Sequence, residues 1–289
     1  MAKRQYYYKH RTKDSFIKLK ECLLKYNYQP TKYVLIPSLL EQKDCVRLVE
    51  TYDCLEKVSF EGNQYFGITN AMEWVEDYYS EKEMNAISKA PINKATLEGP
   101  ETLRWIQLIE LEMLIGLDRI CRKYNLKYSL ATGTLLGAVR HGGFIPWDDD
   151  IDVCMLYEDY KRFIEIAPTE LDTEKSFIKT QETDEDCNLI FAQIKRNDTI
   201  FLREGRNEFK THKGVFIDIF SLFNGSKYRV IHCFQDRISK FFKTMTWAHM
   251  GHKVKEILLE DGIICSLLVY LIKKLCVVLE ICNDDKKGK

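Results

Sequence analysis

The segment that most constrains this chain is 131–153, ATGTLLGAVRHGGFIPWDDDIDV, in which acidic residues alternate with branched aliphatic ones. In a β-strand, residues two apart share a face. If the strand begins early enough, Asp148, Asp150 and Asp152 therefore line one face, and Asp149 points away. The aliphatic residues between them form the opposite face and anchor the strand in a core. The segment thus predicts a buried strand with a row of carboxylates along one side.

Carboxylates stacked on one face repel each other unless a cation neutralises them, and oxygen ligands of this kind suit Mg²⁺ or Mn²⁺ rather than zinc. Asp218 lies in the apolar run VFIDIF, where an unpaired charge is costly. On a neighbouring strand, Asp218 would complete a metal site with Asp150 and Asp152. Two alternatives are open. The acidic run is a solvated surface segment, or Asp218 forms a salt bridge with Lys195 or Arg196.

A phosphate site is expected just before the acidic strand. Gly133 and Thr134 follow a predicted strand and open a short helix, whose N-terminus offers backbone N–H groups and a hydroxyl to a phosphate. Arg140 closes that helix and either binds a phosphoryl oxygen or complements the helix dipole. We expect Trp147 to pack under the acidic strand rather than to stack on a base. His212 is expected in a loop or core, with a substrate-facing role as the alternative.

The clearest predicted helix covers 103–124, with apolar residues at three- and four-residue steps. That pattern leaves Glu110, Glu112 and Arg119 largely on the helix's other faces.

Strand signals follow the helix in regular alternation with other elements. KYSLAT at 127–132, DIDVCML at 150–156, NLIFAQIKR at 188–196 and GVFIDIFSL at 214–222 are all typical of strands. A short helix separates the first two of these segments. The alternation predicts an α/β (α+β) core with a mixed sheet flanked by helices.

We expect three parts along the chain. Residues 1–95 form a helical N-terminal appendage, with helices over 37–57 and 70–87. Residues 96–255 form the catalytic core, after a boundary near PINKATLEGP. Residues 256–289 form an apolar helix and a charged tail.

Composition excludes several classes of protein. Lys plus Arg and Asp plus Glu both number 43, so nothing global indicates a nucleic-acid partner. Ten scattered cysteines and an N-terminus without an apolar signal region indicate the cytoplasm. The longest apolar run near the C-terminus, 262–272, is too short to cross a bilayer. We expect it to pack in a core; the alternative is peripheral contact with the inner face of the cell membrane.

The motifs at 133–153 and 212–220 (HKGVFIDIF) together resemble the LicD family, whose wider relatives include fukutin-related proteins. The resemblance covers about 101–223. It implies a nucleotidyltransferase-like fold and the transfer of a phospho-alcohol from a CDP-linked donor, such as CDP-choline, to a glycan or glycolipid acceptor such as lipopolysaccharide or teichoic acid.

Carried over position by position, the resemblance implies a set of site residues. The metal-binding acids are Asp150, Asp152 and Asp218, and the phosphate-side positions are Gly133, Thr134 and Arg140. We add Lys195 as a donor-binding residue and Asp148 as the base that takes the acceptor's proton. The chain departs from the family pattern at 220–223, where Phe-Ser-Leu-Phe replaces Phe-Pro-Leu-Asp, a change that concerns the acceptor and not the metal.

Two rival functions remain at this stage. One is a nucleotidyltransferase that uses the same acids and releases pyrophosphate. The other is a non-catalytic protein that senses nucleotides or serves as a scaffold.

Overall fold

The computed structural model describes part of the chain, namely residues 16–28, 31, 33–35, 46–48, 50–78, 100–184, 187, 189–202, 211–228, 230–232, 234–235 and 238–239. Residues 23–229 form one compact unit, and residues 1–22 group with 230–289 in another. The sheet, its covering helices and the candidate site all belong to the 23–229 unit.

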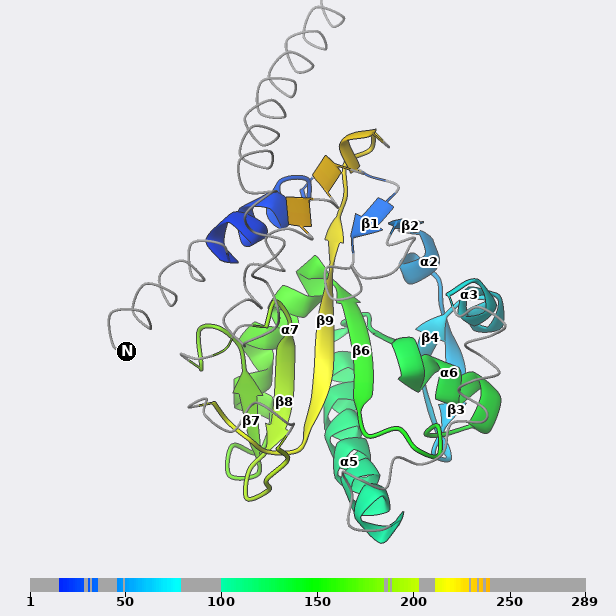
Figure 1. Cartoon of the computed structure of the whole chain (residues 1–289), viewed down its shortest axis with the longest axis vertical. Coiled ribbons are helices and arrows are strands. Elements are labelled where there is room, and N and C mark those ends of the chain that lie inside the picture. The colour runs from blue at the N-terminus through cyan, green and yellow to red at the C-terminus, as the bar shows by residue number, and fades with distance from the viewer. Residues whose placement is uncertain are drawn as a thin grey trace, which may run out of the picture. The chain divides into compact units, whose positions relative to one another are not determined.

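This unit combines strands and helices along its chain (Figure 1). In chain order they are β1 (Tyr33–Leu35), β2 (Val46–Leu48), α2 (Glu50–Asp53), β3 (Leu55–Phe60), β4 (Asn63–Ile68), α3 (Ala71–Tyr78), α5 (Pro100–Tyr124), β5 (Ser129–Leu130), α6 (Thr132–His141), β6 (Ile151–Leu156), α7 (Tyr157–Glu170), β7 (Ser176–Lys179), β8 (Ala192–Arg196) and β9 (Phe216–Asn224).

Strand β9 is the centre of a seven-stranded mixed sheet. It pairs in parallel with β6 and antiparallel with β8 and β1. Its sequence, FIDIFSLFN, is almost continuously apolar, as expected of a strand covered on both faces. The predicted mixed sheet flanked by helices is therefore confirmed.

Helices α5 and α7 pack against β6 and β9, and Figure 1 shows both behind the strands. The sheet face they cover presents four fully buried aliphatic residues, Ile151, Val153, Ile217 and Ile219. The apolar stripe predicted for 103–124 is confirmed, since α5 buries Leu103, Ile106, Met113, Leu117 and Ile120. Because these aliphatic residues alternate with acids in β6 and β9, the acids lie on the other face.

The prediction of a helix over 37–57 is wrong where the structure describes it. Residues 46–48 and 55–57 are in strands, and only the short α2 is helical. Strands β3 and β4 form a hairpin whose turn residues, Glu61 and Gly62, have φ of 49° and 77°. Positive φ at both positions is the type I′ geometry that matches strand twist, a signal the helical interpretation overlooked. The predicted helix over 70–87 is confirmed for 71–78, and 79–87 lie outside the described residues.

Two predicted strands are shorter than expected. Strand β5 ends at Leu130 because α6 already begins at Thr132, and the strand predicted over 188–196 starts only at Ala192. The boundaries at 95 and 255 stay predictions, and the apolar segment 256–289 lies outside the described residues. Within the part of the chain that is described, no helix combines the length and apolar character that crossing a membrane requires.

Candidate metal and phosphate site

Two aspartates occupy paired positions in the centre of the sheet. Asp152 of β6 and Asp218 of β9 are register partners in the parallel ladder, so their side chains share a face. Asp218 is 8% exposed and accepts a hydrogen bond from Gln193 Nε2 at 2.6 Å. Gln193 is in turn the partner of Asp218 in the β8–β9 ladder. The sheet thus fixes two carboxylates side by side and orients one of them.

The surroundings of Asp152 disfavour its negative charge. Burial raises the pKa of Asp152 well above its ordinary value, and the charges of Asp150 and Asp218 raise it further. A hydrogen bond from the Thr132 hydroxyl to Asp152 Oδ2 acts in the opposite direction. Neighbouring carboxylates in a partly buried position are costly as anions, and a divalent cation removes that cost.

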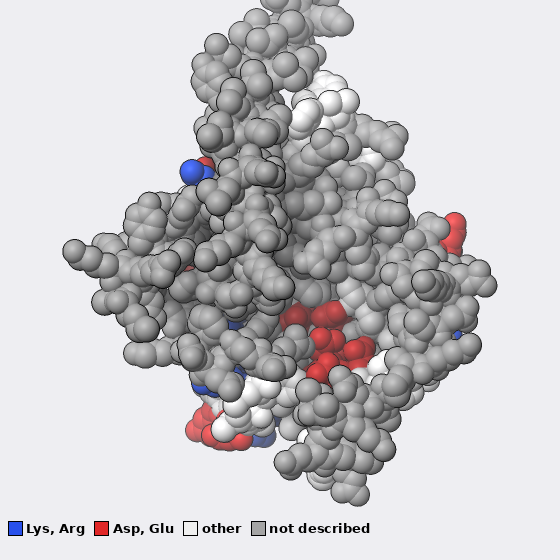
Figure 2. Space-filling model, in the orientation of Figure 1, with Lys and Arg blue, Asp and Glu red and all other residues white. Residues whose placement is uncertain are grey.

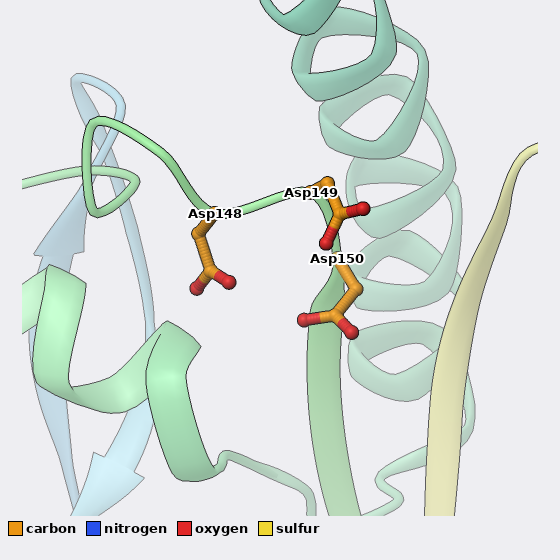
Figure 3. Close-up of side chains that lie close together, drawn as sticks. All are labelled: Asp148, Asp149 and Asp150. Atoms are coloured by element: carbon orange, nitrogen blue, oxygen red, sulfur yellow. The ribbon is translucent and has the colours of Figure 1, made fainter. Parts of the chain in front are cut away.

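A second acidic group precedes β6 in the chain. The carboxylates of Asp148, Asp149 and Asp150 offer oxygens that all lie within 4.8 Å of one another, close enough to share a metal ion (Figure 3). The expectation that Asp149 points away is therefore wrong. The ladder with β9 begins only at Ile151, so the three acids lie in a loop where strand alternation does not apply.

The N-terminal turn of helix α6 contacts both groups of acids. A Cβ added at Gly133 would lie 2.8 Å from Asp148 Oδ2, so the Asp148 carboxylate packs directly on this glycine. The Thr134 hydroxyl accepts a hydrogen bond from the backbone N–H of Asp152 at 2.8 Å. Thr132 has a positive φ of 42°, unusual for a β-branched residue, while its hydroxyl contacts Asp152. Gly133 and Thr134 therefore lie where predicted, and Thr134 also anchors the acidic strand.

Arg140 lies at the opposite end of α6 from Gly133 and Thr134. Arg140 is exposed in the last turn of α6, eight residues after Thr132, which is roughly 12 Å along a helix axis. Lys195 is only 5% exposed. Its Nζ donates to the carbonyl oxygen of Gly214 at 3.2 Å and lies 4.5 Å from the ring centroid of Phe216. Lys195 shares its sheet face with the acids.

Two aromatic residues from the sequence motifs have structural roles. Trp147 packs against the hydrophobic core, as predicted. His212 Nδ1 accepts the backbone N–H of Gly214 at 3.1 Å, and its Nε2 lies 3.0 Å from Asn197 Oδ1. Burial lowers the pKa of His212, whose ring also stacks on Phe177 with centroids 5.2 Å apart. Neutral His212 therefore holds the loop before β9.

A chain of hydrogen bonds that the sequence analysis missed connects the N-terminal hairpin to the acidic loop. Gln107 Nε2 donates to the carbonyl oxygen of Asp148 at 3.0 Å, and Arg104 Nη1 donates to Gln107 Oε1 at 3.2 Å. Arg104 Nη2 contacts Glu61 Oε2 at 2.8 Å, and Glu61 Oε1 accepts the N–H of Phe144 at 3.2 Å. The turn of the β3–β4 hairpin thus braces the loop that carries the acids.

Glu110 of α5 was also missed, because the helical pattern assigned it to another face. It is only 1% exposed. Burial and the charges of Asp150, Asp149, Asp148 and Asp218 raise the pKa of Glu110 well above its ordinary value. A signal existed in the sequence, since Arg104, Gln107 and Glu110 recur at three-residue steps within the apolar helix.

These donors fit a hard divalent cation. The ligand atoms on offer are carboxylate oxygens, and one carboxylate oxygen of Glu110 is buried without a hydrogen-bond partner among the described residues. Figure 2 shows acidic side chains gathered in one patch on the visible face of the molecule. The arrangement suits an ion that binds oxygen and offsets several negative charges.

Comparisons with known proteins find matches to the part of the chain that carries these motifs. Residues 125–251 match the family model described as "LicD/FKTN/FKRP, nucleotidyltransferase domain". A lipopolysaccharide cholinephosphotransferase, LicD, of Haemophilus influenzae is 52% identical over 65 residues, which are 22% of this chain and 24% of that protein. Uncharacterized proteins of Rickettsia prowazekii and Rickettsia typhi are each 37% identical over 82 residues, 28% of this chain and 29% and 25% of theirs.

The matched stretches span about a quarter of each of these relatives. The family model, in contrast, covers α6, the acidic loop, β6 and β9 together. Residues 125–251 of this chain are therefore similar to the LicD family.

Proposed function

We propose that this chain transfers phosphocholine, or another phospho-alcohol, from a CDP-linked donor to a cell-surface glycan in a metal-dependent reaction. The observation that carries the proposal is the pairing of Asp152 with Asp218 next to Asp150, at the head of α6. The Haemophilus relative is named a lipopolysaccharide cholinephosphotransferase, which supports the choice of transferred group and acceptor.

Asp150, Asp152 and Asp218 are the proposed ligands of Mg²⁺ or Mn²⁺. Such an ion, when bound, neutralises the charge of the donor diphosphate and of the departing nucleotide. Gln193 orients Asp218 through its hydrogen bond, and Thr132 orients Asp152 in the same way. The sheet and α6 therefore fix the ligand oxygens before the donor arrives.

The donor's phosphates bind at the head of α6 in this proposal. The backbone N–H groups at Gly133 and Thr134 belong to the positive end of the helix dipole. Lys195 contributes a positive charge from the same sheet face as Asp218. Arg140 binds a phosphoryl oxygen, a role for which its side chain must turn back along α6.

Asp148 takes the proton of the acceptor hydroxyl in the proposed reaction. The hydroxyl oxygen forms a bond to the phosphorus that carries the alcohol, and the bond from that phosphorus to the CMP oxygen breaks in line. Asp148 suits this task because its carboxylate packs on Gly133, next to the proposed phosphate site. The products are a phosphodiester on the glycan and CMP.

A nucleotidyltransferase is the second candidate function. It is favoured by the description of the matching family model, which names a nucleotidyltransferase domain. In that reaction an acceptor attacks the α-phosphorus of a nucleoside triphosphate and pyrophosphate leaves. The same carboxylates serve both reactions, so only the products separate them.

The test is CMP release by the purified full chain with CDP-choline, Mg²⁺ and a glycan acceptor. We expect Asp150→Asn and Asp218→Asn to abolish release, as chelation of the metal also does. Asp53→Asn is the matched control, because Asp53 lies on the surface at the end of α2. Equal CMP release by the two site variants and the control would overturn the assignment of the metal-binding acids.

A further inference from the structure

Among the described residues, Glu110 is a buried carboxyl group near the site that the proposed mechanism leaves without a role. It lies in the middle of α5 and is 1% exposed. Its Oε2 atom has no hydrogen-bond partner among the described residues. A buried carboxyl oxygen normally accepts a hydrogen bond or binds a cation, because burying it otherwise is costly.

The surroundings of Glu110 identify the acidic loop as its neighbour. Gln107, one turn earlier on the same side of α5, donates to the carbonyl oxygen of Asp148 at 3.0 Å. The charge that acts on Glu110 most strongly is that of Asp150, followed by those of Asp149 and Asp148. Figure 3 shows Asp149 and Asp150 next to the helix that passes the start of β6.

Two basic residues of this region, Arg104 of α5 and Arg196 of β8, pair with other acids. Arg104 contacts Glu61 and Gln107, and Arg196 pairs with Glu112. The charges that raise the pKa of Glu110 are those of acids, which disfavour its own negative charge. A cation shared with those acids would offset the cost of a charged carboxylate in this position.

We propose that Glu110 binds the same divalent cation as Asp150, approaching it from α5. The proposal rests on the proposed function, since it adds a ligand to that function's metal site. It also assigns a role to α5, which precedes the matched 125–251 region and supplies none of the residues identified from the sequence.

Two consequences distinguish this role from a merely structural one. Glu110→Gln keeps the shape of the side chain but removes one negative charge, so cation affinity should fall by about 10- to 100-fold. Without a cation, the same variant should melt at or above the wild-type temperature, because it replaces a buried carboxyl group among acids with a neutral amide of the same shape. A packing role predicts the reverse, namely a lower melting temperature and unchanged affinity.

The experiment measures Mn²⁺ and Mg²⁺ binding to the full chain by calorimetry, with bound Mn²⁺ checked by electron paramagnetic resonance. Glu112→Gln is the matched control, because Glu112 lies two residues further along α5 and its side chain is 61% exposed. We expect weaker binding in Glu110→Gln and in Asp150→Asn, and wild-type binding in Glu112→Gln.

Wild-type affinity in Glu110→Gln together with lost affinity in Asp150→Asn would overturn the role of Glu110 and leave the proposed function standing. Absence of binding in the wild type would overturn both. If Glu110→Gln does not fold, the Glu110→Asp variant tests the same role. It keeps the carboxylate but shortens the side chain by one methylene, which moves the carboxylate away from the proposed cation. Weaker binding than in Glu112→Asp supports the proposal, and equal binding overturns it.

Discussion

Asp152 and Asp218 lie opposite each other on two parallel strands, as partners in the ladder between β6 and β9. Hydrogen bonding between the strands sets this proximity, so the two carboxylates cannot separate to relieve their repulsion. Side chains from outside the pair reach each of them, Thr132 to Asp152 and Gln193 to Asp218. The fold therefore holds the two carboxyl groups together in advance of any ligand.

This pair predicts a pH dependence of stability in cation-free protein. Burial, Asp150 and Asp218 raise the pKa of Asp152, so the folded state binds its proton more tightly than the unfolded state does. The stabilisation is complete below the unfolded pKa and is lost as pH rises through the folded pKa. Each unit of difference is worth about 1.4 kcal/mol. With a chelator present, the wild type should therefore lose stability above about pH 4, the ordinary range of an aspartate.

Thermal unfolding between pH 4 and pH 8, with and without Mg²⁺, checks this expectation. Asp152→Asn should flatten the pH dependence and lose the stabilisation that Mg²⁺ gives the wild type at pH 7. Identical pH profiles for the chelated wild type and Asp152→Asn would contradict the account of this pair.

Thr132 provides a second prediction, because its hydroxyl contacts Asp152 from a backbone with φ of 42°. A β-branched residue in this region is strained, and such strain persists where function requires it. Thr132→Ser should keep the hydroxyl and near wild-type cation affinity, whereas Thr132→Val should lower affinity and turnover roughly tenfold, equivalent to one lost hydrogen bond to a charged group. Thr169→Val, on the exposed end of α7, is the control. Equal effects of the Ser and Val variants would show that the hydroxyl is irrelevant.

Replacing either of two helical glycines with alanine should have different effects on turnover and stability. A Cβ at Gly133 meets Asp148 Oδ2 at 2.8 Å, so Gly133→Ala should displace that carboxylate and lower turnover about tenfold with little effect on stability. A Cβ at Gly116 meets only Leu171 Cδ2, at an ordinary 3.5 Å. Gly116→Ala should therefore stabilise α5 by about 0.5–1 kcal/mol and leave turnover unchanged. Denaturant unfolding and initial rates check both variants, and full activity in Gly133→Ala would exclude a role for the position of Asp148.

The hydrogen bonds that connect the β3–β4 hairpin to the acidic loop through α5 predict a variant that loses turnover but stays folded. Gln107→Ala removes the hydrogen bond to the Asp148 carbonyl, which should cost about 1–3 kcal/mol of stability and lower kcat more than it raises KM. Leu108→Ala is the control, since Leu108 is 41% exposed and its loss should change stability by no more than about 0.5 kcal/mol. Unchanged kcat in Gln107→Ala would mean that the loop holds its position without α5.

The sequence predicted the elements whose patterns are local. The apolar stripe of α5, the short helix α6 and the acid-bearing strands β6 and β9 follow from residue spacing within each segment. The proximity of Asp152 and Asp218 was also predicted, because both lie on apolar strands of one core. Their exact register was not, since it depends on strand pairing between segments far apart in the chain.

The missed features depend on contacts between distant segments. Glu61 reaches Arg104 across 43 positions, and Gln107 reaches Asp148 across 41. The position of Asp149 depends on where the β9 ladder begins, and no property of the DDD run itself fixes that start. Glu110 was assigned to another face because polar residues in an amphipathic helix usually face solvent. Functional sites are the places where that rule fails.

The phosphorus that the acceptor attacks distinguishes the two candidate reactions. Attack at the alcohol-bearing phosphorus of a CDP-alcohol releases CMP, whereas attack at the α-phosphorus of CTP releases pyrophosphate. If Arg140 binds the donor phosphates, Arg140→Ala should slow CMP release on the order of 100-fold. Unchanged release in that variant would confine Arg140 to complementing the dipole of α6.

The decisive measurement is product analysis of the purified full chain with Mg²⁺ and a cell-envelope glycan, supplied in separate reactions with CDP-choline, CDP-ribitol, CDP-glycerol and CTP. We expect CMP and a phosphodiester-linked glycan from at least one CDP-alcohol, with both products lost in Asp150→Asn. Pyrophosphate from CTP, with no CMP from any of the CDP-alcohols, would contradict the proposed function.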